Sequence, residues 1–413
     1  MKIVVVGKGG REHALAEALK RSPTVQALWV CPGNAGMVQA GLSCASVETP
    51  TDIVQFCREQ GVTCVVVGPE AAILSDLKQR LEALNIFCFA PSPEVARLES
   101  SKLFCKQILR QADVPTAACT LVANAEQALL AVRTHNFAEP LVVKADGLAA
   151  GKGVWVCENL KKAEEAVQSL GAQFGYPLLL EECLIGRELS AFALCDGEDF
   201  VILGTACDYK RITPDPFSAN TGGMGAYSPC DFISAEDEKN LHEIFSRTLR
   251  CLQQQGLPYQ GFLFAGLMKT EKGLYVLEYN VRMGDPETQA LLPRLRSDFA
   301  ELIHAAVTHR LPSVSCQTSS EVAVHVVAVS QGYPQSEMLL NQPLQIRDAA
   351  ENSSSHIYFA GVQKKDQQLI NTGGRVVGVT ALASSREEAR RRAYVGLERI
   401  SFSGMYFRED IGQ

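Results

Sequence analysis

The sequence predicts an α/β and α+β multidomain protein, in which a doubly wound parallel sheet comes first and a small α+β unit comes last. Three observations support this fold class. Short apolar strands alternate with helices over residues 1–98, as in a parallel sheet covered on both faces. The middle of the chain carries strands joined by glycine-rich turns, and a low-complexity segment at 312–320 sets off the final part. At 413 residues, the chain is long enough for about two to four such units.

Composition excludes several classes of protein. The formal net charge is −7, whereas a nucleic-acid-binding surface needs clustered Lys and Arg. No apolar run approaches membrane-spanning length, and the start of the chain, MKIVVVGKGGREHA, has glycines and charges where a signal peptide would be cleaved. We therefore expect a cytoplasmic monomer that binds small molecules and contacts neither nucleic acid nor a membrane.

The fourteen cysteines do not have the spacing of a metal site. None are arranged as Cys-x-x-Cys, and several lie in apolar runs typical of buried strands, namely Cys64, Cys88, Cys157 and Cys195. We expect reduced core residues rather than metal ligands or disulfides.

Over the first 98 residues, strands are predicted at 3–6, 27–30, 64–67 and 86–89, and helices at 12–20, 53–59 and 77–84. Ligands of such sheets bind beyond the carboxyl ends of the strands, where three loops follow, at 7–13, 32–36 and 68–70. We expect these loops to face one crevice, with a phosphate at the helix N-terminus near Gly10 and Arg11. The alternative is that their glycines only form turns. A nicotinamide cofactor is not expected, because Glu12 stands where the dinucleotide fingerprint has its last glycine.

The stretch 140–156 predicts a phosphate-covering hairpin. A strand delivers Lys144, and the turn that follows contains Gly151, Lys152 and Gly153. Glycine backbone N–H groups can close on phosphate and lysines add charge, although no Gly-Lys-Ser/Thr opens a helix as a Walker motif would. Read alone, the same residues also suit an ordinary tight turn. A helix from 100 to about 114 carries two further lysines, and residues 120–185 form a compact unit that could act as a lid.

Acidic residues follow the next predicted strand, at 177–180. Glu181, Glu182 and Glu188 suit recognition of adenine and ribose, although acidic strand ends are common. Asp208 then precedes a loop that closes with a dense glycine run, Asn220-Thr221-Gly222-Gly223. Such a run rarely serves packing alone, so we expect its backbone to approach a ligand.

The stretch 275–288 predicts a metal and phosphate site. On a strand, Glu278, Asn280 and Arg282 project from one face at period two. Carboxylate and amide oxygens suit a magnesium ion on a triphosphate, and a guanidinium suits an anion. The alternative is a solvated polar face of an edge strand. After a helical region to about 310, the final unit shows no catalytic constellation, and Arg375 and Arg408 are its candidates for reaching the crevice.

Together these motifs resemble a known family. VVKADGLAAGKGV, EECL, ANTGGMGAYSP, YQGFLFAGLM, LEYNVRMGDPETQ, GGRVVGVTA and REDIG are similar to the phosphoribosylamine-glycine ligases of purine synthesis, which are ATP-grasp enzymes. The similarity runs from VVGKGGREHALA to REDIG, and GGREHA, NTGGMGAYSP and GDPETQ are its most specific parts. The resemblance implies an N-terminal domain at 1–98, an ATP-grasp domain at 99–311 with a mobile lid at about 120–185, and a C-terminal domain at 320–413.

The resemblance also implies roles for individual residues. ATP would be held through its phosphates and its adenosine by Lys102, Lys144, Gly151, Lys152, Gly153, Glu181, Glu182, Leu184 and Glu188. Glu278 and Asn280 would hold Mg²⁺ or Mn²⁺, and Lys144, Asp208 and Arg282 would serve catalysis. The amino acid and the amine would lie against Asp208 and Arg282 and against the loop residues Gly9, Gly10, Arg11, Asn34, Gly36, Glu70, Asn220, Gly222 and Gly223.

The reaction implied is a ligation in two steps. The carboxylate of glycine attacks the γ-phosphorus of ATP to give glycyl phosphate and ADP. The amine of 5-phosphoribosylamine then displaces phosphate and gives glycinamide ribonucleotide. Charge stabilisation by the metal and lysines, and exclusion of water by the lid, would drive this chemistry.

Some residues depart from the family pattern. After Gly68-Pro69-Glu70 the family usually has a Pro-Leu, a glycine and an aspartate, whereas this chain has Ala72-Ile73, Asp76 and Gln79. Elsewhere, Met37, Ser218-Ala219 and Phe359 replace threonine, Gly-Pro and histidine. These changes leave open a related ligase with a different amino acid or amine. A nucleotide-binding regulator without turnover is a third reading, opposed by the intact Lys144, Glu278, Asn280 and Arg282.

Overall fold

The N-terminal part of the computed structural model is a parallel sheet of five strands in the order β3-β2-β1-β4-β5. The structure describes residues 1–148, 153–215, 218–347 and 355–413. The five strands are β1 (Lys2–Gly7), β2 (Ala27–Pro32), β3 (Ser43–Cys44), β4 (Cys64–Val67) and β5 (Phe87–Phe89). This sheet confirms the predicted doubly wound N-terminal fold, and β4 has the predicted bounds.

Helices cover this sheet at positions that its sequence marks. They are α1 (Gly10–Lys20), α2 (Ala35–Gln39), α3 (Pro50–Gln60), α4 (Glu70–Ile73) and α5 (Leu77–Glu82), and the next helix, α6 (Arg97–Ser100), packs instead against the central part of the chain. The start of α3 is set by Thr49, whose hydroxyl caps the helix, and its end by Gly61, at φ +63°. The loops after β1, β2 and β4 meet at one edge, where the N–H of Gly33 donates to Gly7 O (3.1 Å).

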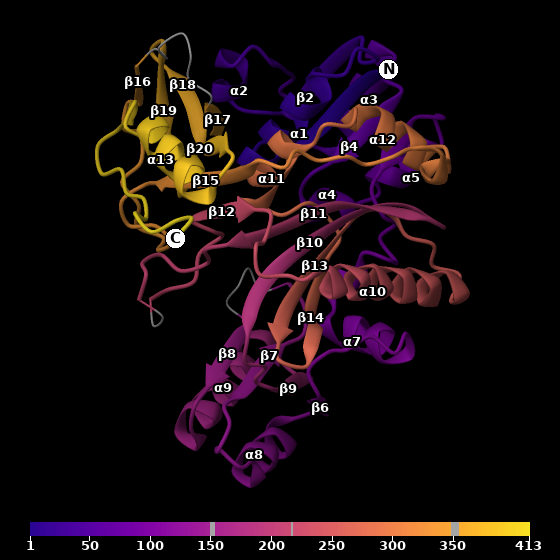
Figure 1. Cartoon of the computed structure of the whole chain (residues 1–413), viewed down its shortest axis with the longest axis vertical. Helices are drawn as coiled ribbons and strands as arrows, with labels where there is room; N and C mark the ends of the chain where they lie inside the picture. Colours follow the sequence, from indigo (N-terminus) through magenta and orange to yellow (C-terminus); the bar gives the residue numbers. More distant parts are fainter. Residues whose placement is uncertain (149–152, 216–217, 348–354) are drawn as a thin grey trace.

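The central sheet has eight strands in the order β14-β13-β10-β11-β12-β15-β20-β17 (Figure 1). Their bounds are β10 (Arg187–Asp196), β11 (Phe200–Asp208), β12 (Gly225–Ser228), β13 (Gln260–Thr270), β14 (Gly273–Asn280), β15 (Val322–Val329), β17 (Ser355–Phe359) and β20 (Arg375–Ala383). Because β12 pairs with both β11 and β15, the sheet runs without a break into the last part of the chain. The sequence did not reveal this continuity.

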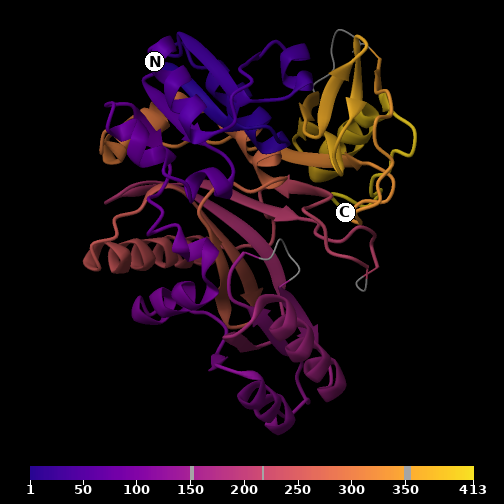
Figure 2. The ribbon, with the colours of Figure 1, turned by 180° about the vertical axis from the view of Figure 1, so that it is seen from behind.

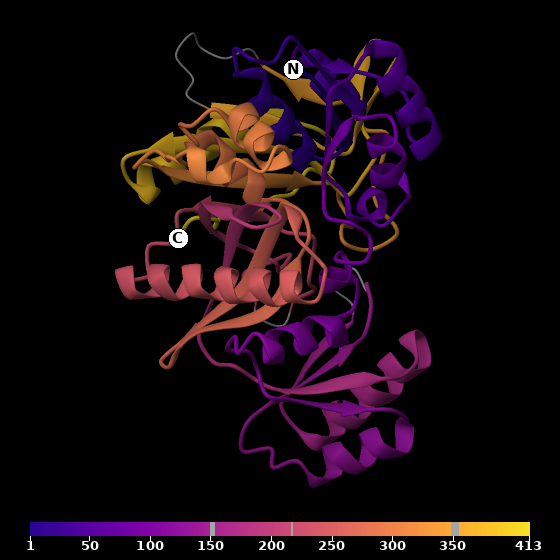
Figure 3. The same cartoon turned by 90° about the vertical axis from the view of Figure 1, so that its right-hand side faces the viewer.

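A separate four-stranded sheet, in the order β6-β9-β7-β8, lies at the end of the molecule opposite the N-terminal sheet (Figures 1 and 3). It consists of β6 (Cys119–Val122), β7 (Leu141–Ala145), β8 (Val154–Cys157) and β9 (Leu178–Glu182), with α8 (Ala125–Thr134) and α9 (Leu160–Phe174) packed on it. We call this part the lid unit. It has a hydrophobic core of its own, and β7 and β8 form the predicted antiparallel hairpin.

The remaining helices fill the space between the sheets and cover their faces. They are α7 (Lys102–Gln111), α10 (Ala235–Gln254), α11 (Glu287–Leu291), α12 (Phe299–Val307) and α13 (Arg386–Leu397), with short 3₁₀ turns η1 (Leu292–Arg294) and η2 (Leu311–Ser313). The short strands β16 (Gln345–Ile346), β18 (Val362–Lys365), β19 (Gln368–Asn371) and β21 (Ile400–Ser401) complete the last part, which packs beside the N-terminal sheet (Figure 2).

The central sheet is buried on both faces by different partners. Leu189 and Ala191 of β10 share a core with α10, whereas Phe192 and Leu194 share a core with α12 and the N-terminal sheet. These residues alternate along β10, so the two cores lie on opposite faces of the strand. Aromatic rings link the central sheet to the N-terminal sheet and α12. Phe262 packs edge-on against Phe89, with ring centroids 4.8 Å apart, and lies parallel to Phe299 at 6.1 Å.

Two further observations bear on the composition-based expectations. All fourteen cysteines are free, and most of them are buried. Among the described residues, no helix is long and apolar enough to span a membrane.

The aromatic contact between the N-terminal and central sheets predicts a stability effect. Phe89 is fully buried against Phe262, so Phe89→Ala should destabilise the protein by about 3–5 kcal/mol through the cavity that it leaves. The midpoint of urea unfolding measures this effect. Phe87→Ala is the matched control on the same strand, because Phe87 is 42% exposed and should cost less than about 1 kcal/mol. Equal shifts for the two variants would contradict the packing role of Phe89.

Candidate functional site

Polar residues gather on one face of the central sheet, near the point where β10, β13 and β14 run side by side. Gly266 of β13 pairs with Ser190 on one side and with Glu278 on the other, so these three residues form one row across the sheet. Asn280 and Glu188 lie two residues along their strands and therefore share this face. A Cβ on Gly266 would lie 3.3 Å from Glu278 Cγ, so the glycine leaves room beside this carboxylate.

Glu278 and Asn280 present oxygen atoms of the kind that Mg²⁺ prefers. Glu278 is exposed, and its carboxylate makes no hydrogen bond among the described residues. Asn280 is 9% exposed. In the described ranges no three His, Cys, Asp or Glu side chains are grouped as a complete metal site. Two oxygen ligands from the protein nevertheless suit magnesium that is bound mainly through a nucleotide's phosphates.

Arg282 does not lie on the strand, contrary to the sequence prediction. β14 ends at Asn280, and the chain turns there towards α11. The guanidinium still folds back to the site: Nη2 lies 2.8 Å from Glu99 Oε1 and Nε lies 3.1 Å from Glu70 Oε2. Burial alone would raise the pKa of Glu70, but Arg282 and then Arg11 hold it below the usual value. Glu99, which sequence reasoning missed, thus helps to orient Arg282.

Two lysines meet one buried carboxylate where the lid unit contacts α7. Glu181, 2% exposed, lies 2.8 Å from Lys144 Nζ and 3.3 Å from Lys106 Nζ. Glu181 therefore uses its carboxylate to position lysines. Lys106 is one of the two lysines on the helix predicted from residue 100, and the sequence indicates no role for it because its partner is 75 residues away in the chain.

Lys102 lies close to the same group. Its ammonium donates to Gly147 O (2.9 Å), and its pKa is lowered by burial, with Glu278 opposing this shift and Lys144 reinforcing it. The structure thus brings Lys102, Lys144 and Glu278 together from α7, β7 and β14. Gly151 and Lys152 lie outside the described residues. Gly153 accepts a hydrogen bond from the Ala145 N–H (2.9 Å) at the base of the hairpin.

The segment between β9 and β10 connects the lid unit to the central sheet. Glu182 accepts a hydrogen bond from the Ala118 N–H (2.9 Å), and Leu184 lies in the connection that follows. At the start of β10, Glu188 forms an ion pair with Lys210, which lies 3.6 Å from Asp208. Lys210 lowers the pKa of Glu188, whereas burial raises the pKa of Asp208.

Glu287 is a further buried acid that the sequence reasoning did not single out. It is 4% exposed at the first position of α11 and accepts a hydrogen bond from Ser190 Oγ (3.2 Å). Burial, and then the nearby Asp208, raise the pKa of Glu287 to about 7. Its place in the GDPETQ motif was the only available signal.

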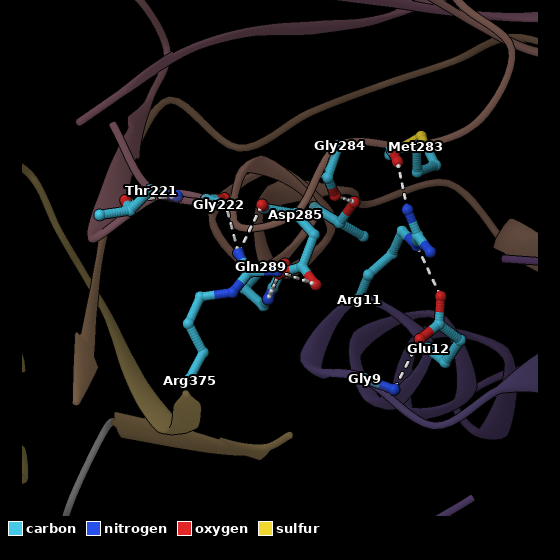
Figure 4. Close-up of polar contacts among 12 residues, drawn as sticks. Gly9, Arg11, Glu12, Thr221, Gly222, Met283, Gly284, Asp285, Gln289 and Arg375 are labelled. Carbon is cyan, nitrogen blue, oxygen red and sulfur yellow. Dashed lines mark hydrogen bonds and ion pairs between the residues drawn. The ribbon is translucent and has the colours of Figure 1, made fainter. Parts of the chain in front are cut away.

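The glycine-rich loop is fixed by the last part of the chain. Arg375 donates to Gly222 O (2.7 Å), Asp285 O (2.7 Å) and Asp285 Oδ2 (3.0 Å), as Figure 4 shows. Gly223 has φ +111°, and a Cβ there would lie 2.3 Å from Pro286. Asn220 pairs with Arg211 across the base of the loop. The structure thus brings the predicted loop residues together and makes Arg375 their anchor.

The Glu12 side chain occupies part of the space beside the first loop of the N-terminal sheet. Glu12 accepts hydrogen bonds from the Gly9 N–H (2.7 Å) and from Arg11 Nε (2.6 Å), and Arg11 also donates to Met283 O (3.2 Å; Figure 4). Cβ atoms at Gly7 and Gly68 would lie 2.4 and 2.1 Å from the Glu12 side chain. Gly10 lies against Gln289, where a Cβ would be 2.7 Å from Nε2. The predicted phosphate contacts of Gly9, Gly10 and Arg11 therefore compete with contacts within the chain.

The second loop is covered by Phe359. Asn34 caps α2 by accepting from the Met37 N–H (2.9 Å), and its amide donates to Phe359 O (3.1 Å). The Phe359 ring lies directly on Gly36, where a Cβ would be 2.1 Å from it, and stacks on His13. Three of the residues that depart from the family pattern can be placed here. The Met37 side chain is fully buried and Asp76 pairs with Arg80 on α5, whereas the Phe359 ring lies against the predicted acceptor loop.

Comparison with known proteins gives a consistent result over the whole chain. The N domain of phosphoribosylglycinamide synthetase matches residues 1–99, its ATP-grasp domain residues 100–288 and its C domain residues 323–413. A phosphoribosylamine–glycine ligase from Rhizobium meliloti (strain 1021) is 40% identical over 419 residues, covering 100% of this chain and 98% of that protein. The corresponding ligase from Caldanaerobacter subterraneus is 38% identical over 422 residues, with 100% and 99% coverage.

Solved structures agree with this result. The crystal structure of phosphoribosylamine–glycine ligase from Thermotoga maritima has a TM-score of 0.87 at 31% identity and covers 100% of both chains. A biotin carboxylase from Campylobacter jejuni, at 17% identity and a TM-score of 0.76, covers 100% of this chain and 94% of its own and shares the fold alone. The chain belongs to the phosphoribosylglycinamide synthetase family, and it contains the ATP-grasp domain of that family.

Proposed function

We propose that this protein joins glycine to 5-phosphoribosylamine at the expense of ATP, giving glycinamide ribonucleotide, ADP and phosphate in purine synthesis. The observation that carries the proposal is the meeting of Lys102, Lys144 and Glu278 at the open polar face of the central sheet. The two lysines would bind phosphate groups, and the Glu278 carboxylate would bind a metal ion. Relatives that carry the ligase name are about 40% identical over essentially the whole chain.

ATP would bind between the lid unit and the central sheet. Lys102 and Lys144 would contact its phosphates, and the backbone from Glu181 to Leu184 would hold the adenine. Lys144 retains N–H donors for the phosphates, since its ammonium has three hydrogens and the ion pair with Glu181 occupies one of them. Glu188 would hold the ribose hydroxyls beside Lys210.

Glu278 and Asn280 would hold the Mg²⁺ or Mn²⁺ that accompanies ATP. A divalent ion there supplies neutralisation of charge on the transferring phosphoryl group. The protein's own contribution is to present the Glu278 carboxylate without a competing partner among the described residues and to orient the Asn280 oxygen beside Arg282.

The acid and the amine would meet on the other side of the phosphates. Arg282, held by Glu70 and Glu99, is oriented to receive the glycine carboxylate, while Asp208 lies on the same sheet face as Glu188. The glycine carboxylate attacks the γ-phosphorus, and the amine of phosphoribosylamine then attacks the resulting acyl carbon and expels phosphate. Gly9, Gly10, Arg11, Asn34, Gly36, Asn220, Gly222 and Gly223 would surround the amine substrate and its phosphate.

Several broader features belong to the same proposal. The functional domains would span 1–98, 99–311 and 320–413, with the lid at about 120–185 closing on the connection at Leu184 to exclude water. The protein would act as a cytoplasmic monomer. A second function, ligation of a different amine, is favoured by one observation, the Phe359 ring that covers Gly36 and stacks on His13 in the predicted acceptor region.

The direct test is ADP release with ATP, magnesium, glycine and freshly generated phosphoribosylamine, with each component left out in turn. We expect full activity only in the complete mixture, because both carboxylate and amine are consumed. Turnover that ignores phosphoribosylamine but responds to another amine would overturn this assignment in favour of the second function.

Removal of the free carboxylate tests the metal assignment. Glu278→Gln keeps the shape of the side chain but loses its charge, and should lower kcat by roughly a thousandfold, about 4 kcal/mol of lost charge stabilisation. Its thermal unfolding should match the parent, since Glu278 is exposed. Glu271→Gln, in the turn between β13 and β14, is the control and should retain parental kcat. A fully active Glu278→Gln protein would refute the metal role.

A further inference from the structure

Cys207 and Cys230 bring two thiols together inside the central sheet. Their Sγ atoms lie 2.7 Å apart, and their side chains are 7% and 4% exposed. A disulfide bond needs about 2.05 Å, so closure requires a movement of less than about 1 Å. Within the described ranges no other pair of free cysteines makes a sulfur–sulfur contact.

The backbone, rather than a loose loop, holds this pair. Cys207 is opposite Tyr227 in the ladder between β11 and β12. The N–H of Cys230 donates to Thr205 Oγ1 (3.1 Å), and Ser228 Oγ donates to Thr205 O (2.7 Å). Both ends of the segment 208–229 are therefore tied to β11 where the thiols meet.

The pKa values of the two thiols shift in opposite directions. The pKa of Cys207 is lowered by the hydrogen bond from the Cys230 thiol, with the Tyr227 hydroxyl adding to it against the effect of burial. The pKa of Cys230 is instead raised by burial. Cys64 and Cys195, buried without such donors, also have raised pKa values. Because the thiolate is the nucleophile, Cys207 would attack first and Cys230 would complete the bond.

The pair lies directly behind the proposed substrate site. Cys207 and Tyr227 pack in the core shared with α10, whereas Asp208, the next residue, points to the opposite face of the sheet. The segment between the thiols contains Lys210 and the glycine loop that Arg375 anchors. A covalent bond at its base would shift Asp208 and restrict this loop.

We propose that Cys207 and Cys230 are a reversible oxidation site, whose disulfide holds the base of the 208–229 segment and lowers turnover. The oxidant is a peroxide, a molecule small enough for a buried thiol pair. The Cys207 thiolate attacks a peroxide oxygen, forming a sulfenic acid and, after proton uptake, water. The Cys230 sulfur then displaces hydroxide, which leaves as a second water. The sulfurs lose two electrons, the peroxide gains them, and an added dithiol reverses the change.

The experiment oxidises the full chain with hydrogen peroxide, blocks the remaining thiols and maps tryptic peptides. We expect peptides 188–210 and 212–239 to be joined, with fragment ions assigning the bond to Cys207 rather than Cys195. ADP release should fall by about tenfold, because small displacements in an active site are costly, and dithiothreitol should restore it. A bond through Cys195, or no bond, would overturn the proposal.

Variants separate this site from general oxidation. Cys230→Ser should show parental activity when reduced, form no disulfide and lose less activity than the parent on oxidation, because the sulfenic acid at Cys207 then has no second thiol. Cys207→Ser lacks the attacking thiol and should lose none, which keeps the test available if Cys230→Ser folds poorly. Cys316→Ser, outside the sheet, is the control and should remain as sensitive as the parent. Equal inactivation of Cys230→Ser and parent would refute the switch. The activity readout rests on the proposed ligase function, but the mapped bond and its reduction do not, so the two can fail separately.

Discussion

The ion pair between Asp285 and Arg375 joins segments that are far apart in the sequence. Asp285 lies in the turn before α11, Arg375 begins β20, and the same guanidinium holds the carbonyl of Gly222. Arg375, opposing the effect of burial, keeps the pKa of Asp285 low, and both side chains are only partly buried. The last part of the chain thereby shapes the site although it holds no catalytic constellation, and β12 and β15 continue the same connection through the sheet.

Charges elsewhere at the candidate site divide into two groups. Glu181 holds Lys106 and Lys144, and Glu70 and Glu99 hold Arg282, so these ions orient one another before any substrate binds. Glu278 remains exposed and without a hydrogen-bond partner in the described part of the chain. Phosphoryl transfer requires positioning and charge neutralisation rather than a nucleophile from the protein. An oriented set of cations facing a free carboxylate meets that requirement.

Local patterns predicted much of this architecture, and long-range contacts account for what was missed. The apolar run of β4 and the hairpin of β7 and β8 follow from residue type and turn signals alone. The end of β14 before Arg282 could not be predicted, because a polar residue at period two fits a strand or the turn after it. Glu12 lies over Gly7 and Gly68 only because the parallel strands bring the two loops together. Likewise, Glu99 and Glu287 have partners on distant segments, and the place of Glu287 in GDPETQ does not indicate which partner it has.

The central claim is that the protein activates the carboxylate of glycine at this site by phosphoryl transfer from ATP. Turnover of glycine labelled with ¹⁸O in its carboxylate, in the presence of ATP and phosphoribosylamine, tests that claim most directly. The account predicts one labelled oxygen in each phosphate released, because the carboxylate oxygen that attacks phosphorus stays with it when the amine displaces the acyl group. Phosphate free of label would mean that water, and not the carboxylate, receives the phosphoryl group, and would contradict the account.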